Sequence, residues 1–234
     1  MSGPLTIAIP SKGRLMEATF EAFAGAGLSL KRLGSDRGYR AMIDGLAGVD
    51  VHLASASEIA SDLARGHIHL GVTGEDLVSE IFPAGDVRVQ NLKRLGFGGA
   101  DVIVAVPKSW LDVSVMADLE EIAEAFQRTH GRSLRVATKY PRLSRAFFRN
   151  RGVSSYRIVE SLGATEGTPA AGTAEIIVDI TSSGSTLSAN HLKILDDGLI
   201  LKSEACLFAS TLAPIDRASA ELRKTVLDKL GVLA

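Results

Sequence analysis

The residues best suited to chemistry lie in one short stretch of the chain, residues 175–187. It begins with a β-branched apolar run at 176–180 and continues as small hydroxyl residues around Gly184. A buried strand that passes through such a loop into a helix can hold a phosphate, because the first backbone N–H groups of a helix lack internal acceptors and its dipole favours an anion. The carboxylate of Asp179, near the strand end, suits a sugar hydroxyl. The loop therefore predicts a site for a phosphorylated sugar, with hydroxyl donors from Ser182, Ser183, Ser185 and Thr186.

The same composition also occurs where a strand simply turns into a capped helix, without any ligand. The known phosphate-binding fingerprints do not decide between the two interpretations. No lysine follows Gly184, so the loop is not a Walker A sequence, and the G-x-G-x-x-G spacing is absent. On the local pattern alone, a phosphate site and an ordinary connection both stay open.

Composition excludes several classes of protein. The chain has 234 residues, of which 46% are hydrophobic, enough for one large or two small domains. It lacks an apolar run of the roughly 20 residues that a membrane span needs, and Lys12 and Arg14 follow the short apolar segment 5–10 too closely for a signal peptide. The single cysteine, Cys206, forbids an internal disulfide and predicts a reducing cytoplasm. A net charge of −1 argues against a broad nucleic-acid surface.

Short apolar strands alternate with helical patterns along the whole chain. Strands are expected at 5–9, 49–53, 67–72, 101–106, 134–137 and 176–180. Helices are expected after Ser11, near 59–63 up to Gly66, at 75–82, near 119–126 up to Gly131, from Pro141, over 187–192 and over 218–230. This alternation predicts an α/β fold with mainly parallel sheets.

Two stretches suit a crossing of the chain between domains. Residues 90–100 contain three glycines, and residues 199–211 have an extended, apolar pattern. Two crossings would give a discontinuous first domain, 1–94 and 199–234, around an inserted second domain, 95–198. The ligand site would then be a cleft between the two domains.

Several strand-to-helix turns carry unusual residue combinations. They are residues 9–15 (IPSKGRL), 70–78 (LGVTGEDLV), 95–107 (LGFGGADVIVAVP), 135–141 (RVATKYP) and 178–187 (VDITSSGSTL). Together, and over nearly the whole chain, they resemble the short form of ATP phosphoribosyltransferase, the catalytic subunit that begins histidine biosynthesis. No single motif is decisive, whereas the ordered set is specific.

The resemblance implies a two-lobed fold like that of type II periplasmic binding proteins, without a C-terminal regulatory domain. It implies a glycosyl transfer in which N1 of the ATP adenine displaces pyrophosphate from C1 of phosphoribosyl pyrophosphate (PRPP), with Mg²⁺ present. Members that resemble this chain act in the cytoplasm with a regulatory subunit similar to histidyl-tRNA synthetase. A homodimer within such a hetero-oligomer is therefore expected, with neither nucleic acid nor membrane as a partner.

The chemistry of this transfer explains the basic residues. The adenine N1 lone pair needs no strong base, whereas the leaving pyrophosphate gathers negative charge, so catalysis should come from positioning and electrostatic stabilisation. Arginine suits pyrophosphate because its planar fork binds phosphate oxygens bidentately and stays charged. Arg14 is the first candidate, Arg37 the second, and Lys12 a supporting donor. A cation in the first turn of a helix opposes the dipole, which favours an anionic partner for Arg14.

The resemblance also implies roles for the remaining turns. The stretch from Thr181 to Thr186, including Gly184, would hold the PRPP 5′-phosphate, and Asp179 the ribose. Mg²⁺ would be held mainly by substrate phosphates, so no protein metal site is expected. His67 and His69 share a strand face without a third ligand nearby, as ordinary strand histidines do. The nucleotide-binding residues would be Ser11, Gly13, Thr73, Gly74 and Glu166, and the resemblance also implies a ribose contact for Glu166.

The sequence departs from the family at two points. Many members carry an acid in the phosphate loop where this chain has Ser182 and Ser183, although hydroxyls can make the same hydrogen bonds. The basic residue that often follows Arg37 in the family is absent, and Arg40 offers a replacement. Two other functions stay open: a ligand-binding module of the same fold, disfavoured by the missing export signal, and another class of phosphoribosyltransferase, disfavoured because Asp179 stands alone rather than in an acidic pair.

Overall fold

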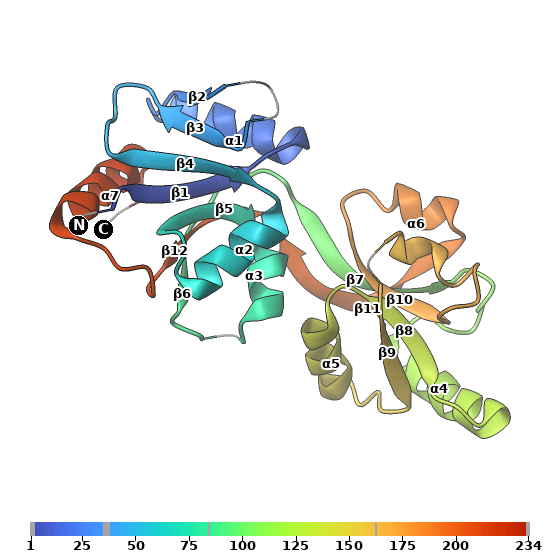
Figure 1. Ribbon diagram of the computed structural model, residues 1–234. Helices are drawn as coiled ribbons and strands as arrows, with labels where there is room; N and C mark the ends of the chain where they lie inside the picture. Colours follow the sequence, from blue (N-terminus) through green and yellow to red (C-terminus); the bar gives the residue numbers. More distant parts are fainter. Residues whose placement is uncertain (1–2, 35–37, 84, 162, 233–234) are drawn as a thin grey trace. The chain divides into compact units, whose positions relative to one another are not determined.

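The computed structural model describes residues 3–34, 38–83, 85–161 and 163–232. They form two compact units, one from Met1–Gly98 with Glu204–Ala234 and one from Gly99–Ser203 (Figure 1). Each unit is described by itself below. The sequence predicts domain boundaries at 94/95 and 198/199. Whether the chain folds as two independent domains with these boundaries stays a prediction.

The first unit is built on a seven-stranded sheet with the order β2-β3-β4-β1-β5-β12-β6. Its centre is parallel, because β1 runs parallel to both β4 and β5. The hairpin β2–β3 extends one edge, and β12 is antiparallel to its neighbours β5 and β6. The strands are β1 (Leu5–Pro10), β2 (Leu30–Arg32), β3 (Arg40–Ile43), β4 (Val49–Ala54), β5 (Leu70–Gly74), β6 (Val89–Arg94) and β12 (Ala205–Ser210).

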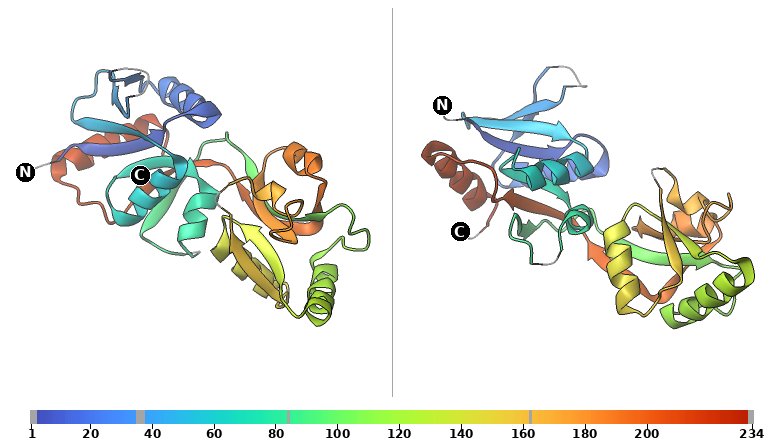
Figure 2. Two further views of the ribbon diagram at one scale, coloured as in Figure 1. Left: turned by 45° about the vertical axis from the view of Figure 1, so that its right-hand side comes forward. Right: turned by 60° about the horizontal axis from the view of Figure 1, so that its bottom comes forward.

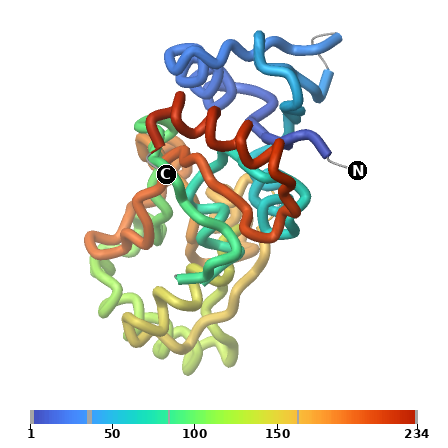
Figure 3. Tube along the Cα trace, turned by 90° about the vertical axis from the view of Figure 1, so that its left-hand side faces the viewer, coloured from blue at the N-terminus to red at the C-terminus, as the bar shows by residue number. Residues whose placement is uncertain are grey.

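Helices cover both faces of this sheet. Because successive strand residues point to opposite faces, Ile7 packs in one buried cluster with Phe23 of α1 and Val226 of α7. Ala8 packs in a second cluster with Ile59 of α2. Figure 3 shows α7, in red, against the N-terminal strands, and α7 contacts β1 directly. The helices are α1 (Gly13–Gly25), α2 (Ala56–Arg65), α3 (Glu75–Ile81) and α7 (Arg217–Lys229).

The second unit has a five-stranded sheet with the order β11-β7-β10-β8-β9. Its central strand β10 is parallel to β8 and antiparallel to β7. Helices α4 and α5 lie on one side and α6 on the other (Figure 2), where Leu187 packs with Ile103 and Ile177. The elements are β7 (Ala100–Pro107), α4 (Met116–His130), β8 (Leu134–Thr138), α5 (Pro141–Asn150), β9 (Tyr156–Glu160), the 3-10 helix η1 (Thr165–Gly167), β10 (Ile176–Thr181), α6 (Ser185–Ala189) and β11 (Leu192–Ser203).

The expectation of mainly parallel sheets is wrong. Among the described strands, four pairings are parallel and six are antiparallel. Parallel neighbours need a crossover connection that is usually a helix. No helix separates β6 from β7 or β11 from β12, and these connected strands belong to different sheets. Strand–helix alternation therefore does not determine whether β7, β11 and β12 run parallel or antiparallel to their neighbours.

The helix expected over 187–192 is shorter than predicted. Helix α6 ends at Ala189, and Leu192 already pairs with Pro107 in the sheet. Asn190 closes the helix, since both its backbone N–H and its side-chain amide donate to the Thr186 carbonyl, at 3.1 and 2.9 Å. His191 follows with φ of 56°, which turns the backbone out of the helix. Part of the stretch 90–100 expected as a crossing, residues 90–94, lies in β6.

An ion-pair cluster fixes the start of β10. Glu175 accepts hydrogen bonds from the Arg135 guanidinium at 2.7 Å and from Arg132 at 3.0 Å. The backbone N–H of Arg135 also donates to this carboxylate at 2.7 Å. Burial raises the pKa of Glu175, but these hydrogen bonds outweigh burial and lower the pKa from 4.5 to about 2. The cluster joins β8 to β10 at the end of the sheet opposite residues 181–186, called here the hydroxyl loop.

Acid should weaken the second unit through this carboxylate. Because the pKa of Glu175 is depressed in the folded state, its contribution is complete above about pH 4.5 and is lost as the pH falls towards 2. We expect Glu175→Gln to lower the urea midpoint at pH 7, and the gap from the wild type to shrink at pH 3. Glu124→Gln, which removes an exposed i,i+4 pair with Arg128, is the matched control. A gap that stays constant with pH would contradict this account.

Candidate active site

The hydroxyl loop forms a polar hollow of about 220 Å³ in the second unit. Strand β10 ends at Thr181, and α6 begins at Ser185 after Gly184, which has φ of 70°. The Thr181 hydroxyl accepts the Gly184 N–H at 2.9 Å, so the loop folds back on the strand end. The hollow is lined by Glu166, Asp179, Ile180, Thr181, Ser182, Ser183, Ser185, Thr186 and Leu187. Folding thus gathers the residues predicted for PRPP, other than Gly184 itself, around one space.

Backbone donors are available in this loop. The N–H groups of Ser183, Thr186 and Leu187 have no acceptor among the described residues. The hydroxyls of Ser183 and Ser185 lie 2.9 Å apart, and the Ser185 N–H reaches the Ser183 oxygen only at 3.4 Å. Such a set of N–H and O–H groups has the chemistry of an anion cradle, since a phosphate offers acceptors only.

Two acids border the same hollow. Asp179 is 8% exposed, and its carboxylate accepts the Ile180 N–H at 2.9 Å. Burial raises the pKa of Asp179 and the charge of Glu166 adds to this, although Lys139 and the hydrogen bonds from Ile180 and Thr165 act in the other direction. Asp179 and Glu166 can accept hydrogen bonds from neighbouring sugar hydroxyls. Glu166, expected to contact nucleotide and a ribose, thus lies beside Asp179 at the hydroxyl loop.

In the first unit, the predicted residues lie along one edge of the sheet. Strands β4, β1 and β5 are parallel, so their carboxyl ends meet at the same edge. Ser11 follows β1, and its N–H donates at 2.9 Å to Ala54, the last residue of β4. Gly74 ends β5 and is the N-cap of α3. In α/β sheets, this carboxyl edge is the usual place for a ligand.

A pair of cations occupies the start of α1. Lys12 is the N-cap, Gly13 has φ of 69°, and Arg14 is exposed in the first turn. Neither the Lys12 nor the Arg14 side chain has a partner among the described residues, and the first turn holds no acid. Two cations at the positive end of a helix dipole leave an uncompensated positive field, which an anion would neutralise.

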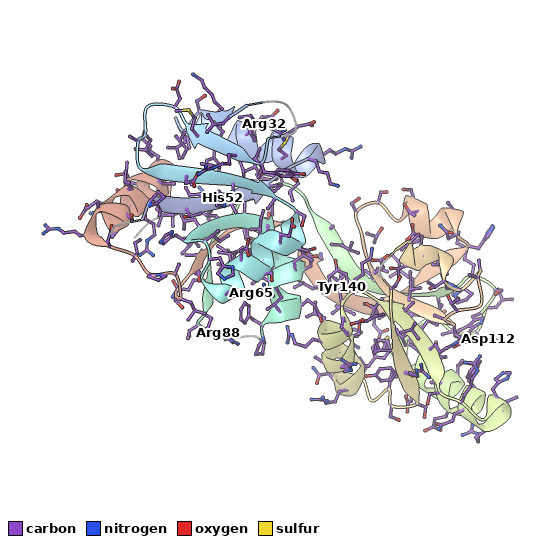
Figure 4. All side chains as sticks on the ribbon, viewed as in Figure 1. Arg32, His52, Arg65, Arg88, Asp112 and Tyr140 are labelled. Atoms are coloured by element: carbon purple, nitrogen blue, oxygen red, sulfur yellow. The ribbon has the colours of Figure 1, made fainter. Side chains whose placement is uncertain are left out.

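Sequence reasoning overlooked Arg32 (Figure 4). Its guanidinium donates to the Ser11 carbonyl at 2.7 Å, from the last position of β2. A hollow of about 420 Å³ adjoins this contact and is lined by Ser11, Lys12, Arg32, Gly38, Tyr39, Ala54, Ser55 and Glu58. The only signal in the sequence was a basic residue at the end of a short apolar strand, which is commonplace on protein surfaces.

Arg40 lies away from this turn. Arg40 pairs with Asp50 at 2.6 Å, and His52 lies 3.1 Å from the same carboxylate. Arg40, the replacement suggested by the sequence, is therefore held in an ion pair on the face of β3 and β4. Arg37 lies outside the described residues.

Thr73 and Gly74 differ in what they can offer a ligand. The Thr73 side chain is fully buried, and its hydroxyl donates to the Ala56 carbonyl at 2.8 Å, so it joins β5 to α2. Gly74 has only its backbone to present. A Cβ at this position would lie too close to Oδ1 of Asp76, so that carboxylate would have to move. Contact with a nucleotide here can only be made by the backbone.

The two histidines expected on a strand face lie just before β5, which begins at Leu70, and both have structural partners. His67 lies 3.3 Å from Asp62, and His69 accepts the Thr6 N–H while its other nitrogen contacts the Pro214 carbonyl, both at 3.0 Å. Within the described ranges, no three His, Cys, Asp or Glu side chains are grouped closely enough to hold a metal ion. None of the helices in the described residues is long and apolar enough to span a bilayer.

Comparison with known proteins identifies the family. The family model described as ATP phosphoribosyltransferase matches residues 55–230. A Bradyrhizobium sp. (strain ORS 278) protein named ATP phosphoribosyltransferase is 56% identical over 234 residues, which are 100% of this chain and 72% of that protein. This chain belongs to the ATP phosphoribosyltransferase family. A Chelativorans sp. (strain BNC1) ATP phosphoribosyltransferase is 58% identical over 226 residues, covering 95% of this chain and 98% of that protein.

The resemblance found in the ordered motifs is thereby confirmed, and so is the activity. ATP phosphoribosyltransferase is a pentosyltransferase that moves the phosphoribosyl group of PRPP to N1 of ATP, releases pyrophosphate and begins histidine biosynthesis. The ligand-binding module and the other class of phosphoribosyltransferase are set aside, because relatives this similar over the whole chain carry the transferase name.

Solved structures confirm the fold class. The "ATP phosphoribosyl transferase (HisG:HisZ) complex from Thermotoga maritima" matches with a TM-score of 0.71 and 23% identity, covering 97% of this chain and 96% of that chain. The substrate-binding protein of an amino acid ABC transporter matches with a TM-score of 0.52 and 11% identity, covering 98% and 93%. The ATP phosphoribosyltransferase fold of this chain is therefore α/β and like that of solute-binding proteins. The fold alone does not separate enzyme from receptor, whereas the sequence identity does.

Proposed function

We propose that the hydroxyl loop of this ATP phosphoribosyltransferase binds the 5′-phosphate of PRPP and that Asp179 and Glu166 bind its ribose. The observation that carries the proposal is the convergence on one hollow of hydroxyls, two acids and N–H groups that have no acceptor in the described part of the chain. The direct test follows phosphoribosyl-ATP by its ultraviolet absorbance after ATP, PRPP and Mg²⁺ are mixed with the purified chain. Absence of product, both alone and with a regulatory subunit, would refute the activity.

The binding site for the leaving pyrophosphate is assigned to the start of α1. Arg14, with Lys12 in support, stabilises the charge that gathers on pyrophosphate as its bond to C1 loosens. Their exposed positions at the positive end of a helix support this role. Arg37 is proposed as the second arginine on the family resemblance alone. Ser11, Gly13, Thr73 and Gly74 are proposed to contact nucleotide, Thr73 through its backbone because its side chain is buried.

Mg²⁺ fits this site only through the substrate. The ion prefers oxygen ligands and keeps several waters, and it is commonly held by one or two carboxylates together with substrate phosphates. Asp179 and Glu166 are the acids that line the hollow, and they would accept hydrogen bonds from the waters of the ion. When bound, Mg²⁺ would neutralise part of the pyrophosphate charge. A chelator should stop turnover, and added Mg²⁺ should restore it.

Removing the Asp179 charge should weaken PRPP binding. We expect Asp179→Asn to raise the KM for PRPP about tenfold, the size expected when one charge-assisted hydrogen bond is lost. Burial raises the pKa of Asp179, so wild-type affinity should fall with decreasing pH through that raised value, as the carboxylate takes up a proton. In Asp179→Asn, the affinity for PRPP should not fall in this way at low pH. Asp112→Asn, an exposed acid of the same unit, is the control. An unchanged KM would remove Asp179 from the ribose site.

A regulatory partner is proposed as well. The Thermotoga maritima structure of similar fold is named as a HisG:HisZ complex, and we propose that this chain forms a homodimer that joins a subunit similar to histidyl-tRNA synthetase. Coexpression with such a subunit, followed by size-exclusion chromatography, tests the assembly, and separate elution would refute it. A cytoplasmic location is proposed from the single buried Cys206, which suits a reducing compartment. Cell fractionation would test it.

A further inference from the structure

Arg32 contacts both ends of the turn that carries the cations of α1. One nitrogen of its guanidinium donates to the Ser11 carbonyl at 2.7 Å and lies 2.9 Å from the Met16 sulfur. Ser11 immediately precedes Lys12, and Met16 follows Arg14 by two positions. A side chain from β2 therefore spans the short segment that presents both cations.

This contact sets the orientation of the backbone. Ser11 is held from two sides, since its N–H donates to Ala54 at 2.9 Å and its carbonyl accepts from Arg32. A trans peptide is planar, and its C=O and N–H point in opposite directions. Fixing the Ser11 carbonyl on Arg32 therefore aims the Lys12 N–H away from Arg32. That N–H has no acceptor among the described residues.

The turn needs such support because its own chemistry opposes it. Lys12 and Arg14 repel each other and the positive end of the helix dipole, and the first turn of α1 holds no acid. Gly13, at φ of 69°, lies between them and leaves the segment conformationally permissive. A charge-assisted hydrogen bond from Arg32 restrains the segment before any anion arrives. Arg32 also adds a positive charge to the same region.

We propose that Arg32 is a positioning residue for phosphoribosyl transfer, which holds the Ser11–Lys12 peptide so that Lys12 and Arg14 face the pyrophosphate. The proposal rests on the function proposed above for Arg14. Arg32 acts through the turn and not on the reacting atoms. It should therefore affect turnover and pyrophosphate binding more than folding.

The test compares Arg32→Met, which keeps the apolar length, with Arg32→Lys, which keeps one charged donor. We expect Arg32→Met to lower kcat about tenfold and to weaken binding of inorganic pyrophosphate, as expected for lost preorganisation. Arg32→Lys should recover most of the loss. Arg88→Met, which removes a surface pair with Asp86 in the same unit, is the control for charge removal. A kcat of Arg32→Met within twofold of the wild type, or a loss that only follows the unfolded fraction at the assay temperature, overturns the proposal.

A double-mutant cycle separates positioning from direct contact. If Arg32 acts through the turn, adding Arg32→Met to Arg14→Ala should lower kcat by much less than it does in the wild type, because only Lys12 is then left to be positioned. Fully multiplicative losses would show independent action and would overturn the positioning role while leaving Arg14 in place. Wild-type turnover in Arg14→Ala alone would instead refute the assignment of the leaving group, and with it the role of Arg32.

Discussion

Arg14→Ala is expected to lower kcat about a hundredfold, the loss typical of removing one charge partner of a transition state. Arg14 is exposed in the first turn of α1 and has no partner among the described residues, so the fold should not depend on it. Its removal should even relieve repulsion with the helix dipole. Steady-state kinetics with ATP, PRPP and Mg²⁺, together with thermal unfolding, would separate the catalytic effect from stability.

Two further variants sharpen this prediction. Arg14→Lys keeps the charge but loses the bidentate fork, so its kcat should fall between those of the wild type and Arg14→Ala. Arg88→Ala removes a paired surface arginine in the same unit and should leave kcat unchanged. Near-normal turnover in Arg14→Ala would show that the leaving group is stabilised elsewhere.

Gly184→Val is expected to abolish measurable PRPP binding while the chain still folds. A Cβ at Gly184 would meet no protein atom within 4 Å, so the new side chain would stand in open space within the hydroxyl loop. Its isopropyl group would then occupy space beside the first N–H groups of α6, where the 5′-phosphate is proposed to bind. Isothermal titration with PRPP measures the effect directly.

Backbone strain must be separated from this blocking effect. Gly184 has φ of 70°, and forcing another residue into this region costs about 1–2 kcal/mol. Gly131 offers a matched control in the same unit, with φ of 66° and no atom within 4 Å of a Cβ, at the end of α4. Gly131→Val should carry similar strain and keep PRPP affinity. Equal affinity in both variants would remove the loop from the phosphate site.

Local signals predicted many elements of the fold, although the strands β2, β3, β6 and β9 were not expected. The apolar run at 5–9 forms β1, and Pro141 is the first residue of α5, where its missing N–H costs nothing. Gly66 and Gly131 end their helices in the left-handed conformation. These features depend on a few neighbouring residues, which is why the sequence revealed them. The direction of β11 and β12 and the short length of α6 depend on distant pairing partners, and both predictions about them needed correction.

The candidate site also has a part that the sequence predicted and a part that it did not. The order of strand, hydroxyl loop and helix at 176–189 was visible in the sequence, since it rests on residue types at adjacent positions. The nearness of Glu166 to Asp179 was implied only by the family resemblance, which gave both a ribose contact, because η1 and β10 meet through packing of the second unit. Likewise, nothing in the sequence indicated that Thr73 would give its hydroxyl to Ala56, or that Arg40 would pair with Asp50.

By itself, the sequence determined the family and the chemistry of the turns, because the order of motifs and the types of residues can be read directly from the chain. Only the tertiary structure decided which side chains are available for that chemistry. Availability depends on burial and on hydrogen-bond partners from distant segments. Arg32, which holds Ser11 across 21 positions of the chain, is the plainest case. Its role arises from the packing of β2 against the start of α1, and a linear pattern cannot encode a contact of that kind.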